Sequence, residues 1–393
     1  MNQNLLKKEA QEFISNNLNT DVHGILLKNI SFANITAKEL VEQIESKSRA
    51  KNKLPTWFST HNIYYPNKLN LSQTSSEATA NYKAAIINGK TLVDLTGGFG
   101  VDAFAFAKRT KKVIHIEKNS TLSSIAGHNF KVLEQNNIVP INEDGVHFIQ
   151  KTTDTFDWIY VDPSRRDKNN KKVFFLEDCE PNVIEHLDLF FSKSPNILIK
   201  TGPLLDIKAG LKQLDHVTEV HIVASENEVK EVLWVLKKER SENTVIKTIN
   251  LKKSRHDKFQ FNLKEELGSV AVYSAPLTYL YEPNAAIMKS GGFQVIAKAY
   301  GINKLNPHSH LYTSNELKEF PGRRFLIDTV LKYNRKEIKS LGIAKANITS
   351  RNFPDSVEGI RKKLKLKEGG DNYLFFTKDH TDKPIVISCK KVF

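Results

Sequence analysis

The stretch Thr91–Asp102, TLVDLTGGFGVD, constrains the fold of this chain more than any other stretch. A short apolar run ends in Asp94 and is followed by Gly97, Gly98 and Gly100, and a helical pattern begins at Asp102. Glycine allows a positive φ or a close approach of a ligand, and the start of a helix offers unpaired N–H groups. The stretch therefore predicts a strand, a tight turn and a helix, with a small molecule bound at the turn.

The spacing of these glycines argues against the two common nucleotide loops. A P-loop requires Lys and Ser or Thr after its last glycine, whereas Val101 and Asp102 follow Gly100, so a bound phosphate would face a carboxylate. A dinucleotide fingerprint has its glycines further apart, as G-x-G-x-x-G. An ordinary tight turn without a ligand is the alternative interpretation.

The totals of the sequence limit the remaining possibilities. A chain of 393 residues is expected to form two or three domains. Its two cysteines, Cys179 and Cys389, are too few for a disulfide framework or a multi-cysteine zinc site, and no metal site is predicted. The first residues lack a secretory apolar core and no run reaches membrane-spanning length, so we expect a cytosolic protein with no membrane partner.

Positive charge is concentrated at the end of the chain. The net charge is +14, and residues 321–393 carry 17 Lys and Arg against 8 Asp and Glu, a net +9. Concentrated cationic charge attracts a polyanion through the release of counterions, so nucleic acid is the leading partner class. A solvated face or a compositional bias toward lysine is the alternative.

The glycine turn resembles the first motif of class I S-adenosylmethionine methyltransferases, in which an acid precedes closely spaced glycines. That cofactor carries an ammonium and a sulfonium and no phosphate, so a carboxylate at the turn is acceptable. The resemblance implies an α/β fold with a Rossmann-like, mostly parallel sheet of seven strands whose last strand is reversed by a hairpin. Runs at 219–223 and 231–236 flank a polar turn and fit that hairpin.

The resemblance also implies the residues that hold S-adenosylmethionine. Glu117 and Asp144 follow the predicted strands 112–116 and 138–141, so both acids are expected at the same edge of the sheet as Asp94. Glu117 is expected to bind the ribose and Asp144 the adenine amino group; alone, each would be an ordinary loop carboxylate. The full predicted cofactor set is Gln73, Ser76, Asp94, Thr96, Gly98, Gly100, Glu117, Asp144 and Asp162. Within it, Gln73 and Ser76 belong to a Ser-capped helix that is otherwise an ordinary packing helix.

The end of the predicted fourth strand, Asp162-Pro163-Ser164-Arg165, is where we expect catalysis. It resembles the Asp/Asn-Pro-Pro-aromatic tetrad of enzymes that methylate base nitrogens, in which the first side chain and the next carbonyl orient the amine. Asp162 and Pro163 match, whereas Ser164 and Arg165 depart from the pattern and leave the target atom open. Catalytic roles are predicted for Asp162, Pro163 and Arg165. Arg165 and Arg166 would clamp a phosphate or stack on a base, or else pair with nearby acids.

A nearby thiol offers a different chemistry. Pyrimidine C5 methylation needs a thiolate, and Cys179 is the one candidate close to Asp162 in the sequence. It follows the fourth strand and not the fifth, so we interpret it as structural.

Motifs in the last third resemble bacterial class I methyltransferases that carry a ferredoxin-like segment and a C-terminal THUMP-like domain. They are Tyr281–Asn284, Pro321–Arg324 and Arg361–Gly370. The predicted domains are a helical segment at 1–70, the methyltransferase domain at 71–275, the ferredoxin-like segment at 276–320 and the THUMP-like domain at 321–393. THUMP domains hold structured RNA, so the resemblance implies RNA, tRNA or rRNA, as partner, with Arg361, Lys362 and Lys363 in contact with it.

The sequence thus favours an S-adenosylmethionine-dependent methyltransferase that acts on a base nitrogen of structured RNA. Two alternatives remain. One is an RNA-binding protein whose cofactor site is not catalytic. The other is a methyltransferase whose acceptor is a protein or a small molecule.

Overall fold

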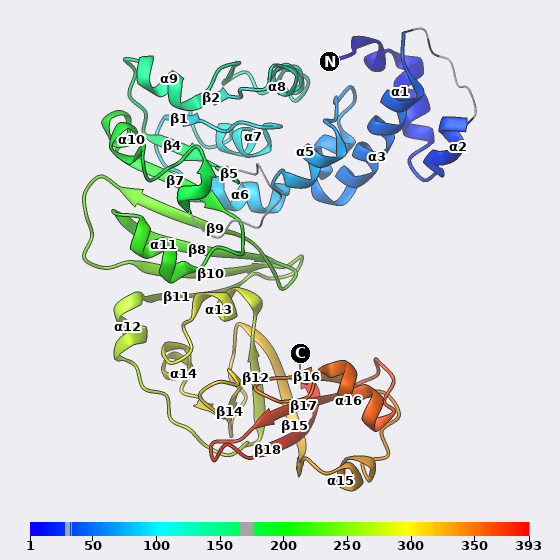
Figure 1. The fold of residues 1–393 in the computed structure, drawn as a ribbon, viewed down its shortest axis with the longest axis vertical. Helices are drawn as coiled ribbons and strands as arrows, with labels where there is room; N and C mark the ends of the chain where they lie inside the picture. Colours follow the sequence, from blue (N-terminus) through cyan, green and yellow to red (C-terminus); the bar gives the residue numbers. More distant parts are fainter. Residues whose placement is uncertain (28–31, 33, 166–175, 393) are drawn as a thin grey trace. The chain divides into compact units, whose positions relative to one another are not determined.

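The computed structural model describes residues 1–27, 32, 34–165 and 176–392 (Figure 1). Its compact parts are two units: unit 1 contains residues 1–218 and 232–241, and unit 2 contains residues 219–231 and 242–393. The two units are groups of residues that contact one another, and their limits do not test the domain boundaries expected from the sequence, which stay predictions.

The first third of unit 1 is helical, as the apolar spacing predicts. Thr36 caps the longest of these helices: its side chain accepts from the Glu39 N–H, and the Glu39 carboxylate accepts from the Thr36 N–H. This reciprocal capping satisfies two N–H groups that have no partner inside the helix. The elements are η1 (Gln3–Leu6), α1 (Lys8–Asn16), α2 (Val22–Leu27), α3 (Ala37–Lys53), α4 (Pro55–Ser59), α5 (Lys68–Gln73) and α6 (Glu77–Ile86).

A nine-stranded sheet follows, in the hydrogen-bonded order β11-β10-β8-β9-β7-β4-β1-β2-β3. The strands β3, β2, β1, β4 and β7 are parallel, and β9 is antiparallel to β7. The predicted α/β class, the parallel sheet and the reversed strand are confirmed, but the sheet has two more strands than the seven expected. The strands are β1 (Thr91–Asp94), β2 (Lys112–Ile116), β3 (Ile138–Ile141), β4 (Trp158–Val161), β7 (Asn196–Thr201), β8 (Val217–Ser225), β9 (Glu228–Lys237), β10 (Val245–Leu251) and β11 (Asp257–Asn262).

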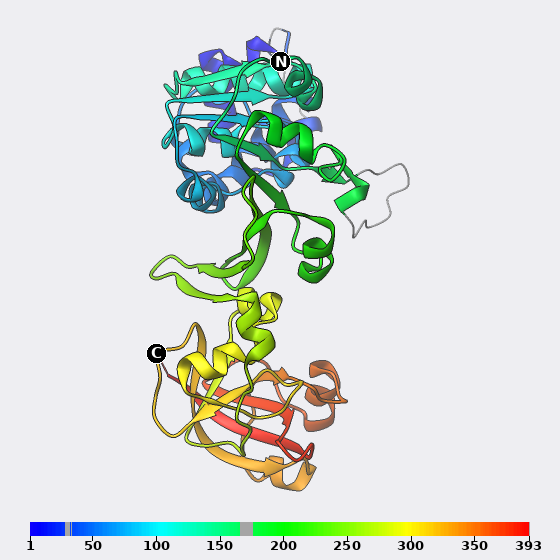
Figure 2. The same ribbon diagram turned by 90° about the vertical axis from the view of Figure 1, so that its left-hand side faces the viewer.

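Among the parallel strands of unit 1, β1, β2, β4 and β7 are largely buried, whereas the edge strand β3 is partly exposed, and the helices of this unit are arranged around the sheet (Figure 2). Burial on both faces explains why β4 and β7 read as nearly continuous apolar runs and not as alternating patterns. Helix α7 packs on α6, and α10 packs on α9. The remaining elements of unit 1 are α7 (Val101–Ala107), α8 (Ser120–Val132), α9 (Gly145–Lys151), β5 (Ser164–Arg165), η2 (Leu176–Asp178), β6 (Cys179–Glu180), α10 (Leu187–Lys193) and α11 (Ile207–Gln213).

Unit 2 contains a seven-stranded sheet in the order β13-β14-β12-β15-β18-β17-β16. One apolar cluster unites Leu280, Phe325, Phe375 and Ile387 of the sheet with Leu305 and Leu311, and another unites Leu374, Phe376 and Val386 with Ile338 and Ile360 from two helices. Since neighbouring residues of a strand point to opposite faces, the two clusters lie on opposite faces of the sheet. The elements are α12 (Leu263–Gly268), β12 (Tyr279–Pro283), α13 (Ala285–Ser290), α14 (Val295–Tyr300), β13 (Asn303–Lys304), β14 (Tyr312–Ser314), β15 (Gly322–Lys332), α15 (Arg335–Lys339), β16 (Asn347–Ser350), α16 (Val357–Leu364), β17 (Asn372–Lys378) and β18 (Pro384–Val392).

Candidate active site

The glycine turn lies between β1 and α7, as predicted, and its glycines have different reasons to be glycine. A Cβ on Gly97 would lie 2.4 Å from the His115 ring, and a Cβ on Gly100, where φ is +89°, would lie 2.4 Å from the Phe130 ring. Gly98 also has a positive φ, +57°, but a Cβ there would meet only the Thr96 carbonyl at 3.8 Å. Gly97 and Gly100 are therefore needed for packing, whereas Gly98 faces open space where a ligand can lie.

Asp94 ends β1 and is only 1% exposed. Its Oδ1 accepts from the Thr96 N–H at 3.0 Å. Burial raises the pKa of Asp94 well above its usual range, and the nearby carboxylates of Asp102, Asp162 and Glu117 raise it further, while the Thr96 hydrogen bond lowers it. Asp94 thus stabilises the turn through this hydrogen bond, and almost none of its surface is accessible to a ligand.

Glu117 follows β2 and is held over the turn by two backbone donors. Its Oε2 accepts from the Gly98 N–H at 2.8 Å and its Oε1 from the Asn119 N–H at 2.7 Å. These bonds orient a half-buried carboxylate at the carboxyl edge of the sheet, directly beside the open glycine. This is the position expected for the ribose-binding acid.

Asp144 follows β3 and is exposed. Its Oδ1 caps α9 by accepting from the Val146 and His147 N–H groups, each at 3.0 Å. The next residue, Gly145, packs so tightly on the chain after β1 that a Cβ would lie 2.3 Å from the Leu95 carbonyl oxygen. The structure thus brings Asp144 to the same edge as Asp94 and Glu117, with one of its oxygens already engaged.

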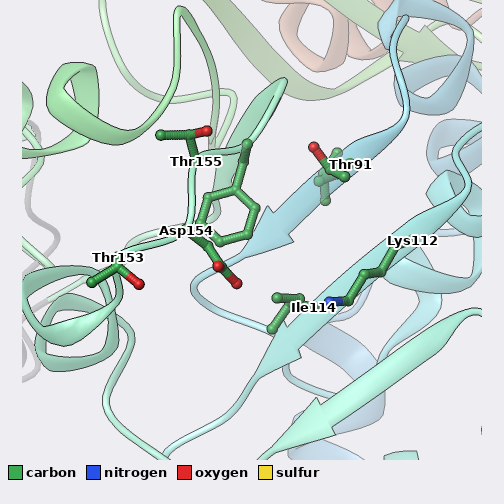
Figure 3. A pocket seen from close by; sticks show the side chains of 8 residues that line it. Thr91, Lys112, Ile114, Thr153, Asp154 and Thr155 are labelled. Atoms are coloured by element: carbon green, nitrogen blue, oxygen red, sulfur yellow. The ribbon is translucent and has the colours of Figure 1, made fainter.

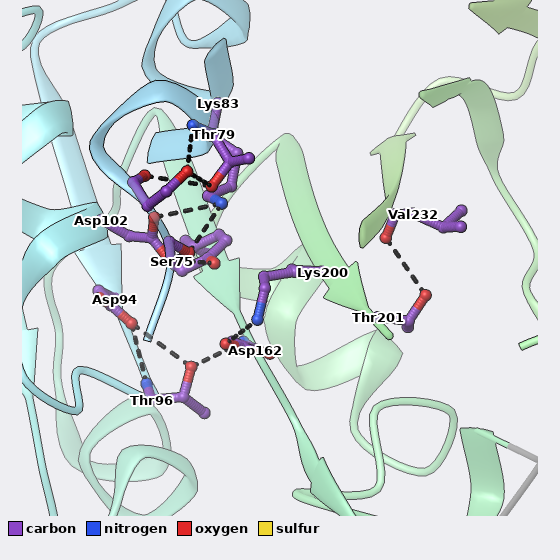
Figure 4. Close-up of polar contacts among 12 residues, drawn as sticks. Ser75, Thr79, Lys83, Asp94, Thr96, Asp102, Asp162, Lys200, Thr201 and Val232 are labelled. Carbon is purple, nitrogen blue, oxygen red and sulfur yellow. Dashed lines mark hydrogen bonds and ion pairs between the residues drawn. The ribbon is translucent and has the colours of Figure 1, made fainter. Parts of the chain in front are cut away.

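Asp162 follows β4 and links three strands (Figure 4). Its N–H donates to the Thr96 Oγ1 at 2.7 Å, and its Oδ2 accepts from the Nζ of Lys200, on β7, at 2.5 Å. The Asp162 side chain is 33% exposed and the Lys200 side chain 14%. Pro163 is buried beside it. Lys200 was not predicted as a site residue. The sequence does place it at the end of the next predicted strand, and the carboxyl ends of parallel strands lie at this same edge of the sheet.

A second buried cation, Lys83, belongs to α6, the helix before β1 (Figure 4). The Nζ of Lys83 is fully buried and lies 3.2 Å from Oδ1 of Asp102, and it donates to the Ser75 Oγ at 3.0 Å. Oδ2 of Asp102 accepts from Ser75 at 2.9 Å and from the Tyr160 hydroxyl at 2.8 Å. This network ties the helix before β1 to the helix after it. The sequence gives no clear indication of it, because α6 also contains the polar residues Glu77 and Asn81.

The two cofactor contacts predicted in the segment before β1, Gln73 and Ser76, lie at the ends of two helices. Ser76 caps α6 by accepting from the Thr79 N–H at 3.2 Å, which confirms the predicted cap. Gln73 is the exposed last residue of α5. Their neighbour Ser75 is buried and belongs to the Lys83 network.

The remaining predicted site residues are Arg165, Arg166 and the three basic residues of the last third. Arg165 is in β5, paired with the half-buried Cys179 of β6, and Arg166 lies outside the described residues. Arg361, Lys362 and Lys363 are in α16 of unit 2. Arg361 donates to the Ala346 carbonyl at 3.2 Å, Lys363 pairs with Asp355 at 2.9 Å, and Lys362 is exposed.

A cavity of about 400 Å³ in unit 1 is not at this edge (Figure 3). Thr91, Lys112 and Asp154 help to line it, and Thr91 and Lys112 begin β1 and β2. It therefore opens at the amino ends of the strands, whereas ligands of α/β sheets bind at the carboxyl ends. Among the described residues, no group of three or more His, Cys, Asp or Glu side chains is placed to hold a metal ion, and no helix is long and apolar enough to cross a membrane.

The chain is similar to a solved structure over nearly its whole length. A protein of Porphyromonas gingivalis W83, described as a candidate methyltransferase, is 32% identical, with a TM-score of 0.88, over 98% of this chain and 97% of that chain. The chain belongs to the same family. This assignment confirms the class I methyltransferase fold.

Two family models match the C-terminal part of this family member: a ferredoxin-like domain at residues 279–321 and a THUMP-like domain at residues 322–391. Both predicted C-terminal resemblances are therefore confirmed. None of the curated proteins compared with the chain matches it.

Other solved structures are similar to part of the chain only. A tRNA m1G37 methyltransferase of M. jannaschii is 16% identical over 43% of this chain and 51% of that chain, with a TM-score of 0.31. TrmK of M. capricolum, solved with S-adenosylhomocysteine, is 15% identical over 42% and 70%, with a TM-score of 0.33. Identities and TM-scores this low say nothing about the reaction or the substrate of this protein.

Proposed function

We propose that this protein is an S-adenosylmethionine-dependent methyltransferase that acts on a base nitrogen of structured RNA, tRNA or rRNA. The observation that carries the proposal is the Glu117 carboxylate, held by the Gly98 and Asn119 N–H groups beside the one glycine of the turn with open space above it. A carboxylate in that position suits two ribose hydroxyls and repels a phosphate.

The charge at this edge supports the same cofactor. The carboxylates of Asp102, Glu117 and Asp162 all act on the buried Asp94, and the cations paired with them are Lys83, on Asp102, and Lys200, on Asp162. Excess negative charge favours a ligand with an ammonium and a sulfonium over a dinucleotide. When bound, S-adenosylmethionine supplies an electrophilic methyl group. Gly98, Glu117 and Asp144 are the residues that would hold it.

Asp162 and Lys200 would prepare the acceptor. With Oδ2 bound by Lys200, the other carboxylate oxygen of Asp162 is the one left to accept a hydrogen bond from the target N–H. That bond would direct the nitrogen lone pair at the methyl carbon, and Asp162 would take the proton as the new N–C bond forms. Lys200 keeps the carboxylate in one orientation throughout, so alignment is not lost when the acceptor arrives.

RNA as the acceptor is supported by the THUMP-like match and by the net +9 of residues 321–393. The decisive experiment is mass spectrometry of RNA nucleosides from cells that lack the protein, in search of one missing methylated base. We expect that mark to return with the wild-type gene and not with Asp162→Ala. An unchanged nucleoside profile would contradict the proposal.

The two alternatives predict other outcomes. An RNA-binding protein without catalysis would take up S-adenosylmethionine and RNA but transfer no methyl group. A methyltransferase of proteins or small molecules would work without RNA and respond weakly to salt.

A further inference from the structure

Unit 2 contains a buried carboxylate shared by two partly exposed arginines. Arg323 Nε donates to Glu282 Oε2 at 2.6 Å, and Arg351 Nη2 donates to Glu282 Oε1 at 3.1 Å. The Glu282 side chain is 6% exposed, whereas Arg323 is 39% and Arg351 32% exposed. We call Arg323 and Arg351, held on Glu282, the arginine pair.

The arginine pair closes a curled sheet. Glu282 is on β12 and Arg351 follows β16, and β15, β18 and β17 lie between these strands in the sheet order. Strands spaced about 4.8 Å apart would put β12 and β16 about 19 Å from each other in a flat sheet, too far for an arginine to reach. The contact therefore requires a concave sheet face, with the arginine pair across its opening.

The surroundings of the arginine pair are aromatic and positively charged. The Arg323 guanidinium lies 5.5 Å from the ring centre of Phe325 and 5.9 Å from that of Tyr373, and its Nη2 donates to the Thr349 Oγ1 at 3.4 Å. Burial, and then the charges of Lys304, Arg351 and His308, lower the pKa of His310 to about 4. Lys304 and Arg351 are thus close enough to His310 to act on it.

The arginine pair can do more than close the sheet. One carboxylate balances only one of its two charges, and within the described part of the chain no partner is found for either Nη1 atom. A guanidinium presents its donors in a rigid fork that fits phosphate oxygens, and Glu282 fixes both forks before a ligand arrives. Little conformational entropy is then lost on binding.

We propose that the arginine pair binds a phosphodiester of RNA at the concave face of the unit 2 sheet. This inference rests on the proposed function, since it names the place where the RNA substrate is held. It differs from the sequence prediction, which put RNA contacts on α16. That helix packs with the apolar cluster on the opposite face, and two of its three predicted residues already have protein partners.

The test removes the arginine pair without leaving a buried charge unpaired. Glu282→Leu combined with Arg323→Met and Arg351→Met lowers the net charge by one, and such buried ion clusters tolerate apolar replacement. Lys339→Ala, at an exposed residue of α15, changes the net charge by the same amount. Binding of a fluorescein-labelled single-stranded RNA and of total tRNA is followed by anisotropy.

We expect the triple variant to bind at least tenfold more weakly, with a salt slope smaller by about 0.7 for each lost phosphate contact, and Lys339→Ala to lose less than twofold. Equal affinities of the two variants, both with wild-type circular dichroism, would overturn the proposal.

A measurement on the wild-type protein covers the case in which the triple variant does not fold. Phenylglyoxal modifies accessible arginines, and mass spectrometry reports the rate at each site. RNA should protect Arg323 and Arg351 and leave the exposed Arg335 of the same unit unprotected. If RNA does not change the modification rate at Arg323 and Arg351, the proposal is contradicted.

Failure here is distinguishable from failure of the proposed function. RNA binding is measured without S-adenosylmethionine, so protection without any methyl transfer would keep the arginine pair and reject the enzyme. Methylation of RNA by the triple variant with a wild-type KM would keep the enzyme and reject the arginine pair.

Discussion

In both units a buried or nearly buried charged group holds groups of the opposite charge, but the sign of the buried group differs between the units. At the carboxyl edge of unit 1, the buried ammonium of Lys83 and the nearly buried one of Lys200 hold Asp102 and Asp162, and backbone N–H groups hold Glu117. In unit 2, one buried carboxylate, Glu282, holds two arginines that remain partly exposed. In each unit a buried or nearly buried group of one charge thus holds groups of the opposite charge in place. This difference in sign is what the two proposals predict, a cationic ligand at unit 1 and an anionic one at unit 2.

The largest expected effect is on the buried cation of unit 1. Lys83→Met leaves Asp102, 12% exposed, without its ammonium, and should lower the free energy of unfolding by about 3–5 kcal/mol. Urea unfolding followed by tryptophan fluorescence reports unit 1, because Trp57, Trp158 and Trp234 all belong to it. Adding Asp102→Asn should recover most of the loss. An unchanged free energy of unfolding in Lys83→Met would show that Lys83 does not stabilise unit 1 by pairing with Asp102.

The next effect concerns pH and the buried His115, against which the glycine turn packs. Burial lowers the pKa of His115 to about 4, so below 6.5 the unfolded chain binds a proton that the folded chain does not. The contribution of His115 to the stability of unit 1 should therefore fall by about 3 kcal/mol as the pH drops from 6.5 to 4. The raised pKa of Asp94 acts in the opposite direction, but equally in the wild-type protein and in His115→Leu, so the difference in free energy of unfolding between these two proteins reports His115. That difference should change by about 3 kcal/mol over this range, whereas His310→Leu in unit 2 should show no such change in unit 1. A difference that does not depend on pH would contradict the prediction.

The third prediction separates packing from binding within the glycine turn. Gly97→Ala forces a Cβ toward the His115 ring and should cost about 1–3 kcal/mol of stability. Gly98→Ala meets no close atom and should cost about 1 kcal/mol, from its positive φ alone. Only Gly98 faces the proposed ligand, so its variant should lose more affinity for S-adenosylhomocysteine per unit of stability lost. Thermal melts with and without that ligand compare the two, and the reverse ranking would place the ligand elsewhere.

The smallest effect is expected on α16. Replacing Arg361, Lys362 and Lys363 by alanine removes three positive charges, three times the change in the triple variant of the arginine pair. If total charge governs RNA binding, the α16 variant is the weaker binder. We expect the opposite, a loss below tenfold, or under about 1.4 kcal/mol, in the same anisotropy assay.

Much of unit 1 was predictable because strand ends follow directly from apolar runs. Asp94, Glu117, Asp144 and Asp162 each follow such a run, and parallel strands bring their carboxyl ends to one edge. What no spacing reveals is which atoms are already engaged. The Asp144 cap, the burial of Asp94 and the pairing of Lys200 with Asp162 depend on contacts between distant segments.

Unit 2 was less predictable for the same reason. The basic run at Arg361–Lys363 is conspicuous in the sequence, whereas Glu282, Arg323 and Arg351 are far apart in it. Glu282 and Arg323 meet because β12 pairs with β15, and Arg351 reaches Glu282 because the sheet curls. The two additional strands, β10 and β11, also escaped prediction, since a seven-stranded pattern was already complete without them.

The most direct test of the account is calorimetric titration of S-adenosylhomocysteine into the wild-type protein and into Glu117→Gln, with Glu143→Gln as the matched control. If Glu117 holds the ribose, one saturable site is expected in the wild-type protein and in the control, with at least tenfold weaker binding in Glu117→Gln. No heat of binding in the wild-type protein, or equal affinity in all three, would contradict it.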